Sequence, residues 1–391
     1  MSRPTSSRSS PAAPAASSSS ASASSAPDLT LPDPPHSNAS AVVFSPTPAS
    51  TTSLLVSSWD HHVHHYTIDT AQISSTSAIR KIQTFPHEAP VLDVCYITPT
   101  LAASASVDRR IRLLDLSTGK TLILGKHEDT DKVLAMDVSP PFAQAVGSDE
   151  KIYSASKPGI PTKRDSTPRL VVAMAGRHVH VYDLLPLRRT IDKERSGQEV
   201  KARDWAPDQR RESSLKFMAR DLRCMPAGDG YAMSSIEGRI AVEFFDTSEA
   251  VQSGKYAFKC HRETIKEGQE VDDMGIEGEE EMEKPYDVVF PVHGIAFHPR
   301  HGTFASLGGD SIVSVWDAAA KKRIRQYPKL SSCVTAGAFD PSGSLLLVAT
   351  GSSELRDGDE VKVELVIKCN AWNECKPRLK SSSSSSSSSK K

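Results

Sequence analysis

The sequence lacks the features of a secreted or membrane-spanning protein. It has no Cys-x-x-Cys pair, no apolar run near the roughly 20 residues that cross a membrane, and no apolar secretory-signal core in residues 1–26. Cysteines scattered through apolar runs are typical of buried free thiols in a reducing compartment. We therefore expect a soluble nucleocytoplasmic protein with no disulfide framework among its six cysteines, which are Cys95, Cys224, Cys260, Cys333, Cys369 and Cys375.

An excess of charge of either sign is also missing. The chain has 47 Lys and Arg residues against 48 Asp and Glu residues, which gives a formal net charge of −1. No overall field therefore draws it to nucleic acid or to an anionic membrane. We expect neither as a direct partner, and any recognition by charge must come from local clusters.

The motifs of common catalytic sites are absent from the sequence. There is no GxSxG nucleophile elbow, no GxxxxGK(S/T) phosphate loop, no HExxH, and no GxGxxG after a strand. Asp60, Asp108 and Asp310 recur because a turn needs a residue that bonds its own backbone, and they are not paired catalytic acids. We expect no enzymatic activity and no cofactor.

A cluster of histidines suggests a metal site. His61, His62, His64 and His65 surround Val63, and the second and third of them fall on one face of an expected strand. No further Cys, Asp or His cluster is visible to complete the coordination shell. Ordinary turn and strand positions explain these histidines better, so we predict no metal.

One pattern recurs between the polar ends of the chain. A strand of small residues leads into an Asp or Gly turn, and a second strand with alternating apolar residues follows it. The copies are LLVSSWDHHVHHYTI (54–68), LAASASVDRRIRLLDL (101–116), LVVAMAGRHVHVYDL (170–184), YAMSSIEGRIAVEFFD (231–246) and TFASLGGDSIVSVWD (303–317). Shorter strands precede several copies, at 41–47, 91–99, 294–302 and 336–343.

The spacing of the copies predicts a WD-repeat propeller. Asp60 and Asp108 lie 48 positions apart, close to the roughly 40–45 residues of a WD40 repeat, and Trp316-Asp317 ends one copy with the WD dipeptide itself. No long segment with a helical period is present to supply crossover helices. Repeated four-stranded units without helices favour an all-β propeller, in which radial closure protects the sheet edges.

Two departures from regular repetition stand out. Only 68 positions separate Asp108 from the turn at Gly176, too few for two ordinary repeats. Either one blade, around 127–170, is shortened, or the sequence lacks a piece of coding sequence. The second departure is a pair of charged, turn-rich insertions, at 191–211 and 264–285, which we expect to be exposed loops.

The ends of the chain have low-complexity composition. Residues 1–36 are rich in Ser, Ala and Pro, and residues 381–391 are a Ser run that ends in two lysines. Such segments bury too little apolar surface to offset the entropy of ordering. We predict disordered tails around a propeller of residues 37–380.

Cationic residues near the expected turns are the best candidates for a binding site. Arg239 follows a Glu-Gly turn, Arg262 ends a strand next to Lys259 and His261, and Arg300 lies in the turn of the next repeat. Guanidinium groups clustered on one rim suit bidentate capture of carboxylate or phosphate. From spacing alone, ordinary surface charges explain these residues slightly better.

Several blocks of the sequence resemble the Bub-three family of mitotic checkpoint proteins, which are seven-bladed WD-repeat scaffolds. A related family, the messenger-RNA export WD proteins of the nuclear pore, shares some of these motifs and is the alternative. The blocks are SSIEGRIAVEFFD (234–246), KYAFKCHR (255–262), RESSLKF (211–217), LLVSSWD (54–60) and KKRIRQY (321–327).

The resemblance implies roles for the candidate residues. Arg239 would pair with glutamates of a short motif in checkpoint kinases and kinase-like proteins, laid across one face of the propeller. Arg262, with Lys259 and Arg300, would read a phosphothreonine of a kinetochore scaffold. Trp59, which from its position in a turn is either a packed structural residue or an aromatic anchor for a peptide, would line the same face.

The resemblance also implies a cellular role and a defect in one blade. The protein would be a nuclear, non-enzymatic, monomeric scaffold that brings the kinases to unattached kinetochores in mitosis. It would support inhibition of the anaphase-promoting complex as part of the mitotic checkpoint complex. The alternative is an export factor that binds a nucleoporin peptide. EKIYSASKPG (150–159) resembles the opening of the fourth of seven blades, so the third, beginning at 127–149, would lack its second hairpin.

Overall fold

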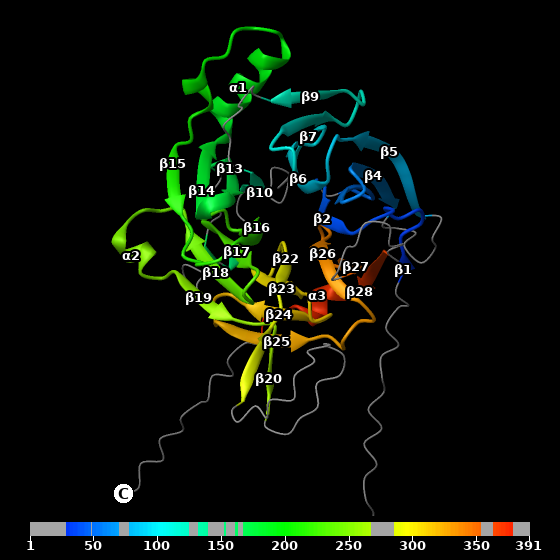
Figure 1. Ribbon diagram of the computed structural model, residues 1–391, viewed down its shortest axis with the longest axis vertical. Helices are drawn as coiled ribbons and strands as arrows, with labels where there is room; N and C mark the ends of the chain where they lie inside the picture. Colours follow the sequence, from blue (N-terminus) through cyan, green and yellow to red (C-terminus); the bar gives the residue numbers. More distant parts are fainter. Residues whose placement is uncertain are drawn as a thin grey trace, which may run out of the picture.

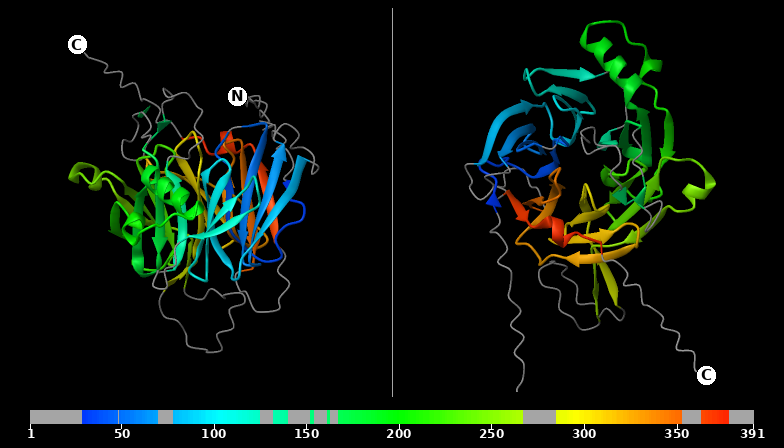
Figure 2. Two further views of the ribbon diagram at one scale, coloured as in Figure 1. Left: turned by 90° about the horizontal axis from the view of Figure 1, so that it is seen from above. Right: turned by 180° about the vertical axis from the view of Figure 1, so that it is seen from behind.

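The computed structural model describes residues 29–47, 49–69, 78–124, 132–139, 152–153, 161–162, 167–266, 285–352 and 363–377. Within these residues, six four-stranded antiparallel sheets surround a central axis (Figure 1). The innermost strands of neighbouring sheets contact one another in a closed cycle. Viewed from the side, the strands run roughly along the axis (Figure 2). The fold is therefore a β-propeller, as the repeats predicted.

We number the blades in chain order and give the strands of each from the axis outward. Blade 1 is β2 (Ala39–Phe44), β3 (Thr51–Ser58), β4 (His62–Asp69) and β5 (Ile79–Pro86). Blade 2 is β6 (Val91–Thr98), β7 (Leu101–Ser106), β8 (Ile111–Asp115) and β9 (Thr121–Leu124). Blade 3 is β10 (Val133–Ser139), β13 (Arg169–Met174), β14 (His178–Asp183) and β15 (Gln209–Glu212).

Blade 4 is β16 (Ala219–Cys224), β17 (Gly230–Ser235), β18 (Arg239–Phe244) and β19 (Tyr256–Lys259). Blade 5 is β22 (Val292–Phe297), β23 (Thr303–Gly308), β24 (Val313–Asp317) and β25 (Lys322–Gln326). Blade 6 is β26 (Cys333–Phe339), β27 (Leu345–Gly351), β28 (Glu364–Cys369) and β1 (Leu29–Thr30). Short elements complete the described residues: the ribbons β11 (Ile152–Tyr153) with β12 (Pro161–Thr162) and β20 (Arg262–Ile265) with β21 (Tyr286–Val289), the helices α1 (Leu184–Arg195), α2 (Glu249–Gln252) and α3 (Ala371–Glu374), and 3₁₀ turns at Ala175–Arg177 and Ala202–Trp205.

The position of a strand in its blade decides its composition. The second strands β7, β17 and β23 consist largely of small residues and are buried along their whole length, because both of their faces pack against neighbouring blades. The outer strand β19 alternates exposed and half-buried residues, as expected for a strand with one face in solvent. The five predicted strand pairs all form second and third strands of blades.

The prediction of seven blades is wrong by one, and the cause lies where a shortened blade was expected. β10 pairs directly with β13, so the first strand of one repeat and the second strand of the next share a single sheet. The expected opening strand at 150–159 does not enter this sheet: β11 pairs with β12 in a separate ribbon. Merging two partial repeats leaves no blade incomplete among the described residues.

The insertion predicted as a loop at 191–211 is partly helical. α1 begins at the N-cap Asp183, whose carboxylate accepts a hydrogen bond from the Leu185 amide at 2.9 Å. Leu184, Leu187 and Ile191 share one face and are buried in the cluster between blades 2 and 3. α1 therefore fills the outer space between these two blades.

The second predicted loop, at 264–285, is flanked by a strand pair, and only its first two residues, Thr264 and Ile265, belong to β20. The ribbon of β20 and β21 borders this segment and projects beyond β25 in Figure 1. Residues 267–284 lie outside the described part of the chain. The longest described helix, α1, has 12 residues, and no helix in the described ranges is long and apolar enough to span a membrane.

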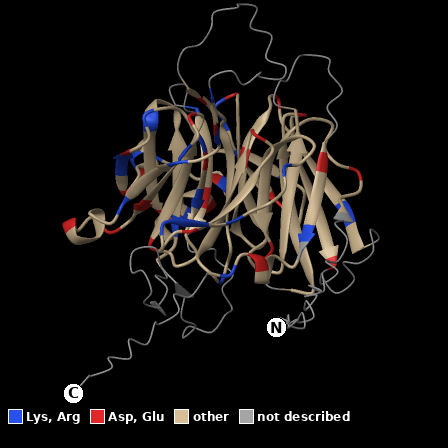
Figure 3. Cartoon of the chain, turned by 90° about the horizontal axis from the view of Figure 1, so that it is seen from below, with Lys and Arg blue, Asp and Glu red and all other residues tan. Residues whose placement is uncertain are grey.

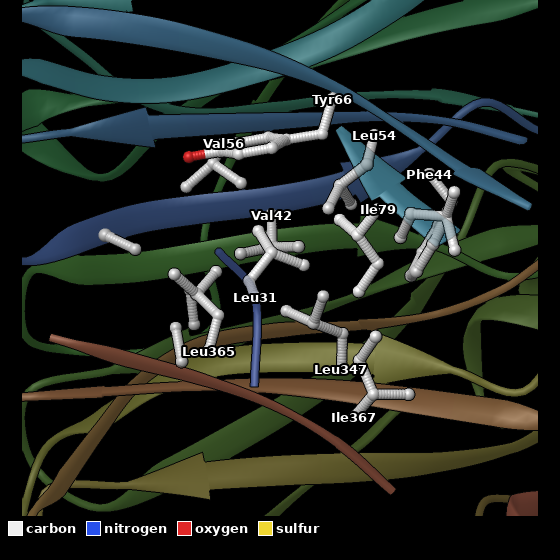
Figure 4. Packing of buried hydrophobic residues seen from close by; sticks show 14 of the residues in the cluster. Leu31, Val42, Phe44, Leu54, Val56, Tyr66, Ile79, Leu347, Leu365 and Ile367 are labelled. Atoms are coloured by element: carbon white, nitrogen blue, oxygen red, sulfur yellow. The ribbon is translucent and has the colours of Figure 1, made fainter. Parts of the chain in front are cut away.

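The first strand closes the ring. β1 pairs with β28, and the Leu31 amide donates to the Leu365 carbonyl at 2.9 Å. Figure 4 shows Leu31 packed among side chains of blades 1 and 6, including Val42 and Leu365. The propeller thus includes residues before the predicted boundary at 37. Most of the predicted tails, 1–28 and 378–391, lie outside the described residues.

Three aspartates join consecutive inner strands, and of these Asp93 and Asp221 are buried and Asp137 is half-buried. Asp93 accepts from the Met136 amide, Asp137 from the Cys224 amide and Asp221 from the Ile295 amide, each at 2.7 Å. These bonds connect blades 2 to 3, 3 to 4 and 4 to 5 in turn. Burial raises the pKa of Asp137 and of Asp221 to about 6, against the opposing effect of the nearby Arg223 guanidinium.

Arg223 balances this group of carboxylates. Its guanidinium lies 3.1 Å from Asp93 and 3.2 Å from Asp221, and it donates to the Met136 carbonyl at 3.3 Å. The side chain of Asp93 is 2% exposed and that of Arg223 is 11% exposed. One arginine of blade 4 therefore reaches past the inner strand of blade 3 to blade 2.

We expect Asp93→Ala to lower the free energy of unfolding by about 3 kcal/mol, because it leaves a buried amide and part of a buried guanidinium unpaired. Thermal and urea unfolding, followed by circular dichroism, would measure the loss. Asp246→Ala, which removes an exposed carboxylate, is the control and should change little. Equal stability of the two variants would contradict a structural role for the aspartate bonds.

Candidate functional site

The two ends of the propeller carry different turns. We call the upper face the end with the turns between second and third strands, at 59–61, 107–110, 175–177, 236–238 and 309–312, and the lower face the opposite end. Figure 3 shows acidic and basic residues interspersed around the ring, in keeping with the net charge of −1. A site that recognises a charged ligand must therefore be formed by a local cluster of residues with one sign of charge.

The turn of blade 4 on the upper face requires a glycine. Gly238 has φ +64, and a Cβ atom there would lie 2.7 Å from the Cys260 carbonyl oxygen. The Gly238 carbonyl accepts from the Cys260 amide at 2.9 Å. This close approach brings the end of β19 against the turn and places three cationic side chains beside it.

Arg239 and Lys259 are directly opposite one another. They form a cross-strand pair at the upper end of β18 and β19. Like charges in this relationship destabilise a sheet, because the side chains repel one another at short range. Because a neutral pair would avoid this repulsion, the pair is a candidate for binding an anion.

Arg262 joins this pair from the next element. The chain bends at His261, which has φ +46, and then enters β20. The Arg262 guanidinium donates to the carbonyls of Glu237 at 3.2 Å and Gly238 at 3.4 Å, and its side chain is 19% exposed. The turn carbonyls thus hold the Arg262 guanidinium beside the turn that precedes Arg239.

A cavity of ≈390 Å³ lies between the turn and the ribbon. Its cationic members are Arg239, Lys259 and Arg262, and Glu237 also lines it. Phe217, Ile236 and Val289 supply apolar surface and are 53%, 37% and 39% exposed. The site therefore combines positive charge with exposed apolar side chains, which suits a peptide with an anionic group.

The expectation that His261 belongs to a basic strand tip is wrong. It is buried, with Nδ1 2.8 Å from Asp310 Oδ1 and Nε2 2.7 Å from Ser306 Oγ, and Trp316 Nε1 donates to the same hydroxyl at 2.8 Å. The Ser-His-Asp order resembles a catalytic triad, but Ser306 is 0% exposed. This group links blades 4 and 5 and holds the bend before Arg262.

Trp59 lies on the upper face but not in this cavity. Its amide donates to the Asn38 carbonyl at 3.0 Å in the turn of blade 1, which stands across the ring from blade 4. The side chain is half-buried. A role for Trp59 as an anchor stays a prediction that needs a peptide long enough to cross the axis.

Arg300 is on the opposite face, so its assignment to the cationic rim is wrong. It lies between β22 and β23, the first and second strands of blade 5, whereas Arg239 is the first residue of β18, a third strand. Successive turns of an antiparallel sheet alternate between its ends. Arg300 and Arg262 therefore face away from each other along the axis.

A buried histidine shapes the turn that carries Arg300. His298 Nδ1 accepts from the amides of Arg300 at 3.2 Å and His301 at 3.1 Å, and its Nε2 donates to the Gly343 carbonyl at 3.0 Å. With Nδ1 as an acceptor and Nε2 as a donor, the ring is neutral. Burial, the largest cause, lowers the pKa of His298 to about 3.

The four histidines of blade 1 do not converge. His64 Nε2 lies 2.9 Å from Asp60 Oδ2, His65 Nε2 lies 2.6 Å from Ser53 Oγ on the other face, and His62 Nδ1 lies 2.6 Å from the Asp60 carbonyl. In the described ranges, no three His, Cys, Asp or Glu residues are grouped to hold a metal ion. Each of these contacts is that of an ordinary strand or turn residue.

Sequence reasoning missed the apolar wall and the acidic residues of the site. Phe217 ends the block RESSLKF, and an aromatic residue among polar ones was a signal for an exposed apolar contact. Asp287 lies 3.5 Å from Arg262, although the two are far apart in the sequence. Their meeting depends on the pairing of β20 with β21.

Comparisons with known proteins decide the family. No protein-family model matches the chain. The mitotic checkpoint protein BUB3.1 of Arabidopsis thaliana is 36% identical over 369 residues, which cover 88% of this chain and 92% of the relative. The mitotic checkpoint protein bub3 of Dictyostelium discoideum is 31% identical over 332 residues, 81% of this chain and 86% of the relative. The chain belongs to the Bub3 family.

The Bub3 family membership confirms the resemblance seen in the motifs and makes this chain a WD-repeat protein of the spindle checkpoint class. The Poly(A)+ RNA export protein of Schizosaccharomyces pombe is 30% identical over 327 residues, 82% of this chain and 83% of the relative. The expected second group of relatives is therefore also present. The ligands of this Bub3-family chain have to be argued from its own site.

We expect Gly238→Ala to disturb both the fold and the site. The new Cβ would meet a backbone carbonyl in a left-handed conformation, which should cost about 2 kcal/mol of unfolding free energy. Thermal unfolding would measure the loss. Gly197→Ala, a left-handed glycine with no atom within 4 Å of its Cβ position, isolates the backbone effect and should cost less. An equal loss would refute the steric argument.

Because the His298 ring is neutral in the folded protein, we expect the free energy of unfolding to depend on pH. With a folded pKa of about 3 against an ordinary 6.5, the unfolded chain binds the proton first, so stability is lost as pH falls below 6.5. The stability difference between the wild type and His298→Gln should shrink by about 2 kcal/mol from pH 7.5 to pH 5.0. Urea unfolding at both pH values measures it, and a constant difference would contradict the assignment.

Proposed function

We propose that this protein is a non-enzymatic adaptor whose upper face binds two kinds of peptide. One is a short acidic motif of checkpoint kinases and kinase-like proteins, captured by Arg239. The other is a phosphothreonine motif of a kinetochore scaffold, captured by Arg262 with Lys259. The observation that carries the proposal is the opposed Arg239–Lys259 pair, which joins Arg262 around one cavity with an exposed apolar wall.

The chemistry of the cavity fits such ligands. Guanidinium groups bind carboxylate and phosphate oxygens with two parallel hydrogen bonds, and a phosphothreonine carries about −1.5 to −2 charges at pH 7. Phe217 and Val289 offer apolar contacts to the residues beside the anion. A peptide that crossed the ring from this cavity would reach Trp59, which would then serve as the second anchor.

The cellular role follows from binding both peptides. An adaptor that holds a kinase motif and a phosphorylated scaffold together would bring the kinase to unattached kinetochores in the nucleus during mitosis. Through the same kinase-like partners it would support the mitotic checkpoint complex and inhibition of the anaphase-promoting complex. It would act as a monomeric scaffold within these hetero-complexes.

We expect Arg239→Ala to abolish binding of the checkpoint-kinase motif, because the acidic side chains lose their cationic partner. Arg262→Ala should mainly weaken the phosphorylated scaffold peptide, by about 2 kcal/mol or roughly 30-fold, since the guanidinium is largely buried. Fluorescence anisotropy with labelled peptides measures both affinities. Arg188→Ala, an exposed arginine of α1, is the control.

Affinities unchanged in both variants would remove the proposed site. A nucleoporin peptide belongs in the same titration, because export relatives are about as similar to this chain as some checkpoint relatives. Preference for that peptide over the kinase motif would favour the alternative function, an mRNA export factor. Phosphate-dependent binding of the scaffold peptide would support the checkpoint adaptor.

A further inference from the structure

Each guanidinium group of the cavity already faces a carboxylate of the chain itself. Arg239 Nε lies 3.5 Å from Glu237 Oε1, and Arg262 Nη1 lies 3.5 Å from Asp287 Oδ2. Distances this long mark weak pairs at the limit of a hydrogen bond. A ligand that approached either arginine would therefore compete with an internal acidic group.

Asp287 is held in place independently of Arg262. Thr264 lies directly opposite it in the ribbon, and the Thr264 hydroxyl donates to Asp287 Oδ1 at 2.7 Å. This hydrogen bond, followed by the effect of Arg262, lowers the pKa of Asp287 below its ordinary value. The carboxylate therefore stays ionised at neutral pH and keeps a partner when Arg262 turns to another anion.

The charges of the site leave a small surplus. Arg239, Lys259 and Arg262 supply three positive charges, and Glu237 and Asp287 supply two negative ones. A peptide carboxylate that displaced Asp287 from Arg262 would exchange one carboxylate contact for another and gain little. A phosphate, with nearly twice the charge and three acceptor oxygens, would gain more from the same exchange.

We propose that Asp287 is an internal competitor for Arg262, which an anionic ligand must displace and which therefore weakens anion binding at this cavity. A phosphate gains more from Arg262 than a carboxylate does, so it overcomes this competition more readily. The inference deepens the proposed function and rests on it, because it concerns phosphothreonine binding at the same cavity. It also assigns a task to the ribbon: β20 carries the arginine and the threonine, and β21 carries the competing acid. The side chain of Asp287 is 40% exposed, so a ligand can reach it.

The test compares three labelled peptides on the wild type and on Asp287→Asn. The peptides share one sequence of the scaffold motif and carry phosphothreonine, glutamate or unmodified threonine at the central position. We expect the variant to bind both the glutamate and the phosphothreonine peptide about fivefold more tightly, the size of an exposed ion pair, because both must displace the same contact. The unmodified peptide has no anion to displace Asp287 and should bind the wild type and the variant equally.

The effect should also respond to salt. Because the competing contact is exposed, raising the ionic strength from about 0.05 M to 0.5 M should reduce the difference between the wild type and Asp287→Asn.

Controls separate a local effect from a general change of charge. Asp246→Asn removes one negative charge at the other end of β18 and should leave the affinities of all three peptides unchanged. Asp287→Ala should act in the same direction as Asp287→Asn, which guards against an effect of the new amide. Thermal unfolding confirms that the variants fold.

The possible results separate a failure of this inference from a failure of the proposed function on which it rests. A wild type that binds none of the peptides refutes the proposed function and the inference together. A wild type that binds the phosphothreonine peptide, with the same affinities for both anionic peptides in both Asp287 variants, refutes the inference alone. Tighter binding of both anionic peptides by both Asp287 variants and not by Asp246→Asn supports it.

Discussion

This propeller depends on hydrogen bonds in which an aspartate of one inner strand accepts from a backbone amide of the next inner strand. Asp93, Asp137 and Asp221 each tie their blade to the following one, and Arg223 keeps the group electrostatically tolerable. The bonds are made by first strands alone. A repeat can therefore lose its outer hairpin and keep its place in the ring, provided that its first strand remains. β10 does so, and it takes its second strand from the next repeat.

The binding site makes the opposite use of electrostatics. Among the inner strands around the axis, the carboxylates of Asp93 and Asp221 pair with the Arg223 guanidinium, largely away from solvent. On the upper face, Arg239 and Lys259 stand opposed and partly in solvent, where repulsion is moderated by water and by Glu237. The glycine turn and the buried His261 network are what hold this arrangement in place, so rigid elements position a cluster of charges that would otherwise separate.

Local alternation of residues was enough to predict the strands, the WD-type repeats and the closeness of Arg239 to Arg262. The blade count was beyond such reasoning, because the partner of β10 depends on which strands the whole chain provides. α1 was missed although Leu184, Leu187 and Ile191 have helical spacing, since the surrounding charges indicated a loop. The error over Arg300 was avoidable: alternation of turns between the ends of a sheet follows from connectivity alone.

The pairing of β1 with β28 has a consequence for synthesis. β1, the first described strand of the chain, pairs with residues 364–369, which form the last described strand. Until those residues are synthesised, β27 presents an unpaired edge, and Leu31 has no Leu365 or Ile367 to pack against. A chain cut short before Glu364 would therefore lose two strands of blade 6, β28 and the β1 that pairs with it, and blade 1 would be joined to blade 6 through β26 and β27 without the Leu31 contacts.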